Sequence, residues 1–251
     1  MSRAREAARE TGLFRIQYMA ARSRAPLRSL SRWGANRHLA RFCTRTLVSY
    51  DRLRNAQELG EAAVREGTPG AFVECGVWKG GVAALLAMVA REENRGRLTH
   101  LFDSFEGLPQ PTEEDGHRAD GYPTRARREE LRPVHLYAAD LASVEQWLFG
   151  PLGLSRAAVR IHKGWFQEVL PRAAPEIGDI SLLRIDADWY ESVKVCLECL
   201  YDRVVPGGYV ILDDYGGYPG CRRAWDEFAV GRGIHVPLNV VDSYGVWLRK
   251  A

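Results

Sequence analysis

Short apolar runs alternate along this chain with stretches whose apolar residues recur at helical spacing. Five runs are short enough to be strands: 71–75, 98–102, 159–162, 180–185 and 209–212. Helical spacing predicts helices over 47–65, 82–93, 141–154, 193–205 and 221–230. Two last strands, 236–241 and 245–248, are predicted to form a hairpin. Strands that alternate with helices predict an α/β fold with a mostly parallel sheet.

The stretch from Asp186 to Asp214 holds the densest group of candidate functional side chains. One apolar run ends at Asp186, and the next ends at Asp213 and Asp214. The helix between them predicts a parallel pair, so both strands end at the sheet edge where open α/β sheets bind ligands. Two carboxylates about 4 Å apart repel by on the order of 4 kcal/mol at an effective dielectric of about 20. A hard cation would relieve that repulsion, so we expect a metal site; capping of turns by these aspartates is the alternative.

A second candidate site follows the first predicted strand. The glycines after Cys75 form a GxxxGG pattern rather than GxGxxG, which disfavours a pyrophosphate cradle and suits a nucleoside ligand without phosphates, such as S-adenosylmethionine. Asp103, at the end of the next strand, is expected to bind ribose hydroxyls. Glu74 could accept a hydrogen bond from an amino group or order the loop. Trp165 and Phe166 could stack on an adenine or pack in the core.

Composition narrows the class of protein. The 251 residues suffice for one large α/β domain, and the net charge of +3 gives no case for nucleic acid. No apolar run of 18 residues predicts a membrane span, and the N-terminus lacks a secretion signal. Five cysteines, an odd number, suggest reduced thiols and a cytoplasmic protein. The CxxC formed by Cys196 and Cys199 lies on an apolar helix face and is interpreted as two core thiols.

Two segments stand apart from the predicted sheet. Residues 1–47 are basic and helix-prone, with no acidic residue between Glu10 and Asp51. They could be a transit peptide, a helix that docks on a partner or acidic substrate, or a solvated extension. Residues 110–133 are polar and aperiodic, which is typical of a lid or substrate loop at a ligand-binding edge.

Five blocks, in this order, resemble the macrocin O-methyltransferase family over about residues 45–250: 73–81, 103–109, 163–166, 184–192 and 206–215. The resemblance implies a Rossmann-like methyltransferase fold, with a mostly parallel seven-stranded sheet and helices on both faces. It also implies S-adenosylmethionine, Mg²⁺ and methylation of sugar hydroxyls on macrolide and aminocoumarin antibiotics. Trp189, where a smaller aliphatic residue is expected, and the Arg-rich start depart from the family pattern.

The resemblance also implies roles for particular residues. By similarity to catechol O-methyltransferases, the metal ligands are Asp186, Asp213 and Asp214, with Mn²⁺ or Ca²⁺ as competitors of Mg²⁺. Asp186 or Asp188 would take the proton of the acceptor hydroxyl, although Asp188 could instead cap a helix. The cofactor-binding residues are expected to be Glu74, Gly76, Trp78, Asp103, Ser104, Gly164, Trp165 and Phe166.

These expectations give one account of the whole chain. Residues 1–47 form a basic helical extension, and residues 48–251 form the methyltransferase domain, with a lid insertion near 104–133. The expected partner is a small glycoside acceptor, without nucleic acid or membrane, and the protein is expected to be a homo-oligomer.

Three alternatives stay open at this point. The acceptor could carry a non-sugar hydroxyl. The enzyme could be metal-free with a histidine base, but none of its six histidines lies in the aspartate blocks. A non-catalytic cofactor-binding protein would be expected to lose the carboxylates, which this chain keeps.

Overall fold

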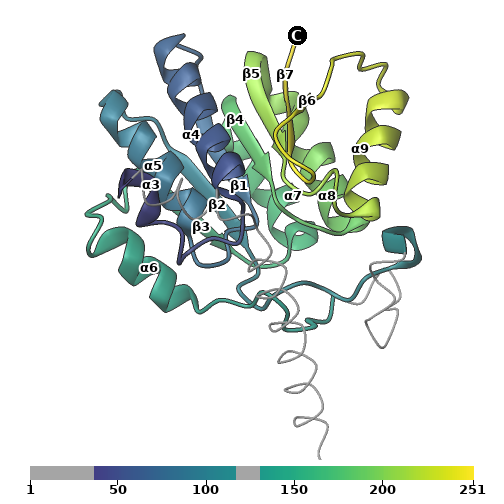
Figure 1. Cartoon of the computed structure of the whole chain (residues 1–251), viewed down its shortest axis with the longest axis horizontal. Helices are drawn as coiled ribbons and strands as arrows, with labels where there is room; N and C mark the ends of the chain where they lie inside the picture. Colours follow the sequence, from purple (N-terminus) through teal and green to yellow (C-terminus); the bar gives the residue numbers. More distant parts are fainter. Residues whose placement is uncertain (1–36, 117–130) are drawn as a thin grey trace, which may run out of the picture.

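One seven-stranded sheet organises the protein (Figure 1), whose structure, a computed structural model, describes residues 37–116 and 131–251. The strand order is β3-β2-β1-β4-β5-β7-β6. The first five strands run parallel, and β7 is antiparallel to both β5 and β6, as the predicted hairpin requires. The strands are β1 Ala71–Cys75, β2 Thr99–Asp103, β3 Val159–Lys163, β4 Ile180–Ile185, β5 Val204–Leu212, β6 Asn239–Val240 and β7 Val246–Arg249.

Helices cover both faces of the sheet (Figure 1). One face packs against α3 Arg37–Ala40, α4 Tyr50–Arg65, α5 Gly81–Glu93 and α6 Leu141–Phe149. The other packs against α7 Phe166–Ile177, α8 Tyr190–Leu200 and α9 Pro219–Gly231. Neighbouring strand residues enter opposite cores: Phe72 and Leu182 lie in the first core, and Val73 and Leu183 in the second. This alternation follows from the pleat of a strand and explains why strands buried on both faces read as continuous apolar runs.

The predicted elements are present, but several differ in extent. The helix expected over 141–154 ends at Phe149, and the strand expected over 236–241 is only Asn239–Val240. The helix expected over 193–205 ends at Leu200, and a 3₁₀ turn, η2 Tyr201–Arg203, leads into β5 at Val204, which pairs with Ile180. Helix α7 was not predicted, because it contains Pro171 and Pro175, which normally interrupt a helix. It forms nonetheless because three of its residues share a buried face: Leu170, Ala174 and Ile177.

The predicted extension and lid are partly described. Leu39 and Phe42 are fully buried in the first core, and the Gly81 amide donates to the Arg45 carbonyl, so the expected boundary at residue 47 falls within a packed segment. The flanks of the lid form a short ladder, in which Leu108 donates to Leu136 and Gln110 to Arg132. The rest of both segments, residues 1–36 and 117–130, lies outside the described residues. None of the described helices has the length and apolar character needed to cross a bilayer.

Candidate active site

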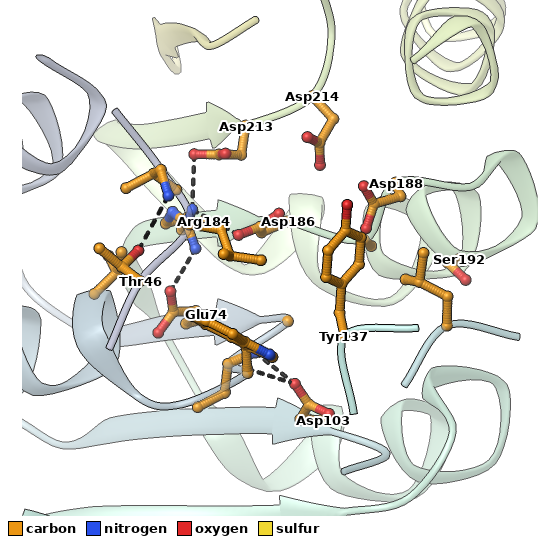
Figure 2. A pocket seen from close by; sticks show the side chains of 18 of the residues that line it. Thr46, Glu74, Asp103, Tyr137, Arg184, Asp186, Asp188, Ser192, Asp213 and Asp214 are labelled. Carbon is orange, nitrogen blue, oxygen red and sulfur yellow. Dashed lines mark hydrogen bonds and ion pairs between the residues drawn. The ribbon is translucent and has the colours of Figure 1, made fainter. Parts of the chain in front are cut away.

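A cavity of about 720 Å³ opens at the carboxyl ends of the parallel strands. It lies where the order of strands reverses beside β1, which is the place at which open α/β sheets bind ligands. Every site residue predicted from the sequence lines this one cavity: Glu74, Gly76, Trp78, Asp103, Ser104, Gly164, Trp165, Phe166, Asp186, Asp188, Asp213 and Asp214. Figure 2 shows the aspartates of β4 and β5 on one side of it and Asp103 on the other.

The two sides of the cavity meet at Gly76, where the loop after β1 abuts the loop after β4. A Cβ at Gly76 would lie 1.8 Å from the carbonyl oxygen of Asp186, and the φ of Gly76 is +92°. The Asp186 amide donates to the Cys75 carbonyl at 2.8 Å. Only glycine fits here, so the first glycine of the GxxxGG pattern allows the acidic loop to approach the predicted cofactor loop closely.

A buried arginine joins the carboxylates of three strands. The Arg184 side chain, 2% exposed, contacts Glu74 Oε1 at 2.5 Å and both Asp186 Oδ2 and Asp213 Oδ1 at 2.7 Å (Figure 2). Burial raises the pKa of Glu74 to about 8 even though Arg184 acts to lower it. The contact survives protonation, because a neutral carboxyl keeps a carbonyl oxygen that accepts from the guanidinium.

Three aspartates bring carboxylate oxygens within 4.8 Å of one another: Asp186, Asp188 and Asp214. Burial, followed by repulsion from neighbouring carboxylates, raises the pKa of Asp188 and of Asp214 well above the usual range. Among the described residues, no hydrogen-bond partner reaches the buried Oδ2 of Asp214. Crowded, desolvated oxygens of this kind fit a hard divalent cation.

Asp213, predicted as a ligand, has other partners. One carboxylate oxygen contacts Arg184, and the other contacts Arg52 from α4. Its carboxylate is not among the three that lie within 4.8 Å of one another, and its role as a cation ligand stays a prediction. Sequence reasoning could not foresee the contact with Arg52, because Arg52 is far from Asp213 along the chain.

On the opposite side of the cavity, Asp103 orders two loops. Its Oδ2 accepts from the amides of Val77 and Trp78 at 2.7 and 2.9 Å, and its Oδ1 accepts from the Phe105 amide at 2.6 Å. Burial raises the pKa of Asp103, while these three amides act to lower it. The carboxylate predicted to bind a ribose therefore also fastens the loop after β1 to the loop after β2.

Several residues that line the cavity have a strained, left-handed backbone conformation. Six described residues other than glycine have a positive φ, and three of them line it: Trp78, Tyr137 and Asp188. Such conformations cost of order 1–3 kcal/mol each and persist only where the surroundings impose them. Beside Asp188, the lid flank supplies that support: Asp115 Oδ1 accepts from the Tyr190 amide at 2.6 Å, and Trp189 Nε1 donates to the Pro109 carbonyl at 3.0 Å. The side chain that accepts from the first amide of helix α8 is therefore that of Asp115, and not that of Asp188.

Sequence reasoning missed several residues of this site. Arg52 was predicted only as part of a helix, and Arg184 only as part of a strand. The charge of Arg184 inside the apolar run 180–185 was nevertheless a signal of a buried ion pair. Tyr137 follows the predicted lid insertion, where no pattern marked it. Four histidines have described side chains, and none lines the cavity: His100, His135, His162 and His235. The five cysteines, all within the described ranges, are free thiols.

Comparison with known proteins places this arrangement in a family. Residues 11–250 match the family model described as Macrocin-O-methyltransferase (TylF). The 8-demethyl-8-(2,3-dimethoxy-alpha-L-rhamnosyl)-tetracenomycin-C 4'-O-methyltransferase of Streptomyces olivaceus is 36% identical over 208 residues, 81% of this chain and 75% of the relative. The mycinamicin III 3''-O-methyltransferase of Micromonospora griseorubida is 33% identical, over 82% of this chain and 78% of the relative. Among solved structures, the O-methyltransferase NovP matches with a TM-score of 0.71 and 32% identity, covering 82% of each chain.

Proposed function

We propose that this chain, which belongs to the macrocin-O-methyltransferase family and is an S-adenosylmethionine-dependent O-methyltransferase, methylates a sugar hydroxyl of a glycosylated natural product with the help of a divalent cation. The observation that carries the proposal is the single cavity that has predicted cofactor residues on one side and an acidic cluster on the other. The free thiols support a cytoplasmic location. The homo-oligomer stays a prediction.

The cofactor side offers groups suited to each part of S-adenosylmethionine. Glu74 Oε2 is buried and, within the described part of the chain, has no hydrogen-bond partner. The ammonium group of the methionyl part would favour the ionised form of Glu74, in which Oε2 can accept from it. Asp103 stands at the end of β2, where ribose hydroxyls are expected. Trp165 and Phe166 begin α7 and line the cavity, where they can contact the adenine. Gly76, Trp78, Ser104 and Gly164 complete the wall.

The acidic side fits a divalent cation. Asp186, Asp213 and Asp214 are the proposed ligands. Oxygens of Asp186 and Asp214 belong to the closely spaced group, and Asp213 follows the same strand, β5, as Asp214. Oxygen ligands favour Mg²⁺, with Mn²⁺ and Ca²⁺ as competitors. When bound, the cation would polarise the acceptor hydroxyl and lower its pKa.

Asp188 is proposed as the residue that takes the proton. One of its carboxylate oxygens lies within 4.8 Å of an oxygen of Asp186 and of Asp214, so its carboxylate can face the same acceptor hydroxyl. Its positive φ, 51°, is held by the loop contacts of Trp189 and Tyr190. Methyl transfer needs the hydroxyl oxygen in line with the sulfonium methyl group, so the chain must fix both partners across one cavity. Asp186 remains the second candidate for the base.

Aromatic side chains support a sugar acceptor. Four of them line the cavity together with the carboxylates: Tyr137, Trp189, Tyr218 and Tyr244. Aromatic rings beside groups that can form hydrogen bonds are typical of sites that bind organic ligands. Trp189 is the residue that departs from the family pattern. Its ring packs edge-on against the Tyr218 ring, with 5.7 Å between the ring centroids, so the two side chains form one continuous part of the cavity wall.

Matched acceptors test the proposed substrate class. We expect transfer of a labelled methyl group from S-adenosylmethionine to rhamnosylated or related glycosides, with product mass and fragmentation placing the methyl group on the sugar. The matching aglycones and simple catechols should be methylated with a kcat/KM at least about a hundredfold lower. They lack the sugar hydroxyls, so the polar groups of the site that would bind those hydroxyls stay unpaired. Faster methylation of the aglycones would contradict a sugar acceptor and support the non-sugar alternative.

A further inference from the structure

A strained turn carries the side chain of Asp188 at the wall of the cavity. The Trp189 amide donates to the Ala187 carbonyl at 2.5 Å, so these two residues enclose Asp188 in a γ-turn. The φ of Asp188 is 51°, and a γ-turn with a positive φ at its centre is rare and strained. Helix α8 begins directly after the turn, at Tyr190. Contacts with neighbouring segments must therefore hold Asp188 in this conformation.

The lid flank, residues 108–116, makes the contact that follows the turn. Asp115 is 1% exposed, and its Oδ1 accepts from the Tyr190 amide at 2.6 Å. Its Oδ2 accepts from the Thr112 amide at 2.7 Å, and the Asp115 amide donates back to the Thr112 carbonyl at 3.2 Å. One buried carboxylate therefore fastens the lid flank to the residue two places beyond Asp188.

The first turn of helix α9 leaves room for this contact. A Cβ at Gly220 would lie 2.2 Å from Asp115 Oδ1 and 2.9 Å from the Tyr190 nitrogen, so a larger residue would displace the carboxylate from the amide. Asp115 and Gly220 are not among the described residues that line the cavity. Any effect of Asp115 on the reaction must therefore be indirect, through the turn that it holds.

We propose that Asp115 is a positioning residue that fixes the turn at Asp188 and so directs the Asp188 carboxylate toward the acceptor hydroxyl. The proposal rests on the proposed function, in which Asp188 takes the proton. Without the bond from Tyr190 to Asp115, the turn can relax to a backbone conformation with a negative φ, and the side chain of Asp188 changes direction with it. Proton transfer needs a base within hydrogen-bond reach, so such a change slows the reaction.

Asp115→Ala should slow methyl transfer without weakening cofactor binding. We expect the single-turnover rate, with saturating S-adenosylmethionine and glycoside, to fall about 10- to 100-fold, because small displacements of a reacting group have effects of this size. The dissociation constant of S-adenosylhomocysteine, measured by calorimetry, should not change, since Asp115 does not belong to the cavity wall. Asp115→Asn should recover most of the rate, because its side-chain oxygen can still accept from the Tyr190 amide.

Asp140→Ala is the matched control for the loss of a helix cap. The Asp140 side chain accepts from the Ser143 amide at 2.9 Å at the start of α6, and it does not line the cavity. Both alanine variants should lower Tm, since each removes a cap from a helix. Only Asp115→Ala should slow methyl transfer.

Gly220→Ala breaks the same contact while Asp115 itself is kept. The φ of Gly220 is not positive, so its backbone accepts alanine, but the new Cβ would push the Asp115 carboxylate away from the Tyr190 amide. This variant should reproduce the slow methyl transfer of Asp115→Ala. Gly231→Ala, at the other end of α9, is its control and should keep the wild-type rate, because a Cβ there meets nothing within 4 Å.

A double variant shows whether Asp115 acts through Asp188. In an Asp188→Asn background, Asp115→Ala should lower the remaining rate by less than about twofold, because residues that act as a unit are not additive. A loss that multiplies in full with that of Asp188→Asn overturns the proposal, since Asp115 would then act on another part of the site.

The remaining outcomes separate this proposal from the proposed function. If Asp188→Asn is slow and Asp115→Ala stays within about threefold of the wild-type rate, the Asp115 proposal alone is overturned. If Asp188→Asn is itself as fast as the wild type, the proposed base fails and the Asp115 proposal fails with it. Should Asp115→Ala not fold, Gly220→Ala decides by the same criteria, and a wild-type rate in that variant overturns the proposal.

Discussion

Replacing Asp188 with asparagine should lower kcat by about 100-fold or more, since a positioned general base contributes typically 10²–10⁴-fold. The substitution keeps the size of the side chain and its capacity to accept a hydrogen bond, but asparagine cannot take the proton of the acceptor hydroxyl. Asp188 is 8% exposed, so bulk water is poorly placed to replace it. Steady-state kinetics with a glycoside acceptor would measure the loss.

Binding measurements distinguish a base from a ligand. If Asp188 is the base, Asp188→Asn should bind Mn²⁺ and S-adenosylhomocysteine nearly as the wild type does, whereas Asp214→Asn should lose affinity for Mn²⁺. Asp179→Asn is the matched control, because Asp179 is an exposed acid just before the opposite end of β4, and its kcat should not change. A variant Asp188→Asn that retains a kcat within threefold of wild type would transfer the role of base to Asp186.

Arg184→Met should produce the largest loss of stability. Arg184 is buried among Glu74, Asp186 and Asp213, and methionine would fill much of its volume without its charge. Removing one partner from a buried ion pair typically costs about 3–5 kcal/mol, because the remaining charges stay buried without compensation. In a domain of this size each kcal/mol lowers Tm by roughly 2–4 °C, so calorimetry would readily detect the change.

Two comparisons test the origin of that loss. Arg232→Met removes the partner of Asp202 at the surface, where both side chains are more than a third exposed, and should cost no more than about 1 kcal/mol. Adding Asp186→Asn to Arg184→Met should recover part of the stability, because one of the acids that lose Arg184 as a partner becomes neutral. A single variant Arg184→Met as stable as the wild type would show that the buried guanidinium does not hold the three strand ends together.

The fold could be predicted largely from local patterns. Strands such as 71–75 and 180–185 are buried on both faces and therefore form mostly apolar runs, interrupted by Glu74 in the first and by Ser181 and Arg184 in the second, and the end of each run located the functional edge. Helix α7 was not predicted, although Leu170, Ala174 and Ile177 recur at helical spacing, because its two prolines oppose helix formation. Burial of that face against the sheet outweighs the prolines.

The sequence predicted which residues line the site, but not which of them form ion pairs there. Strand ends identified Glu74, Asp103, Asp186 and Asp214, because parallel strands deliver their ends to one edge. The partners of Asp213 were not predictable, since Arg52 reaches it from a distant helix and Arg184 looked like one polar residue in an apolar strand. Sequence patterns show which residues reach an edge, but not which of them pair there.

The most direct test of the account is the rate of methyl transfer to a glycoside acceptor before and after removal of divalent cations. We expect EDTA to abolish turnover and Mg²⁺ to restore it, with Mn²⁺ as a possible substitute, while S-adenosylhomocysteine still binds the cation-free protein. That result requires the aspartate cluster to hold a cation beside the cofactor. Full turnover in EDTA would contradict the account, and a methyl transfer without metal would replace it.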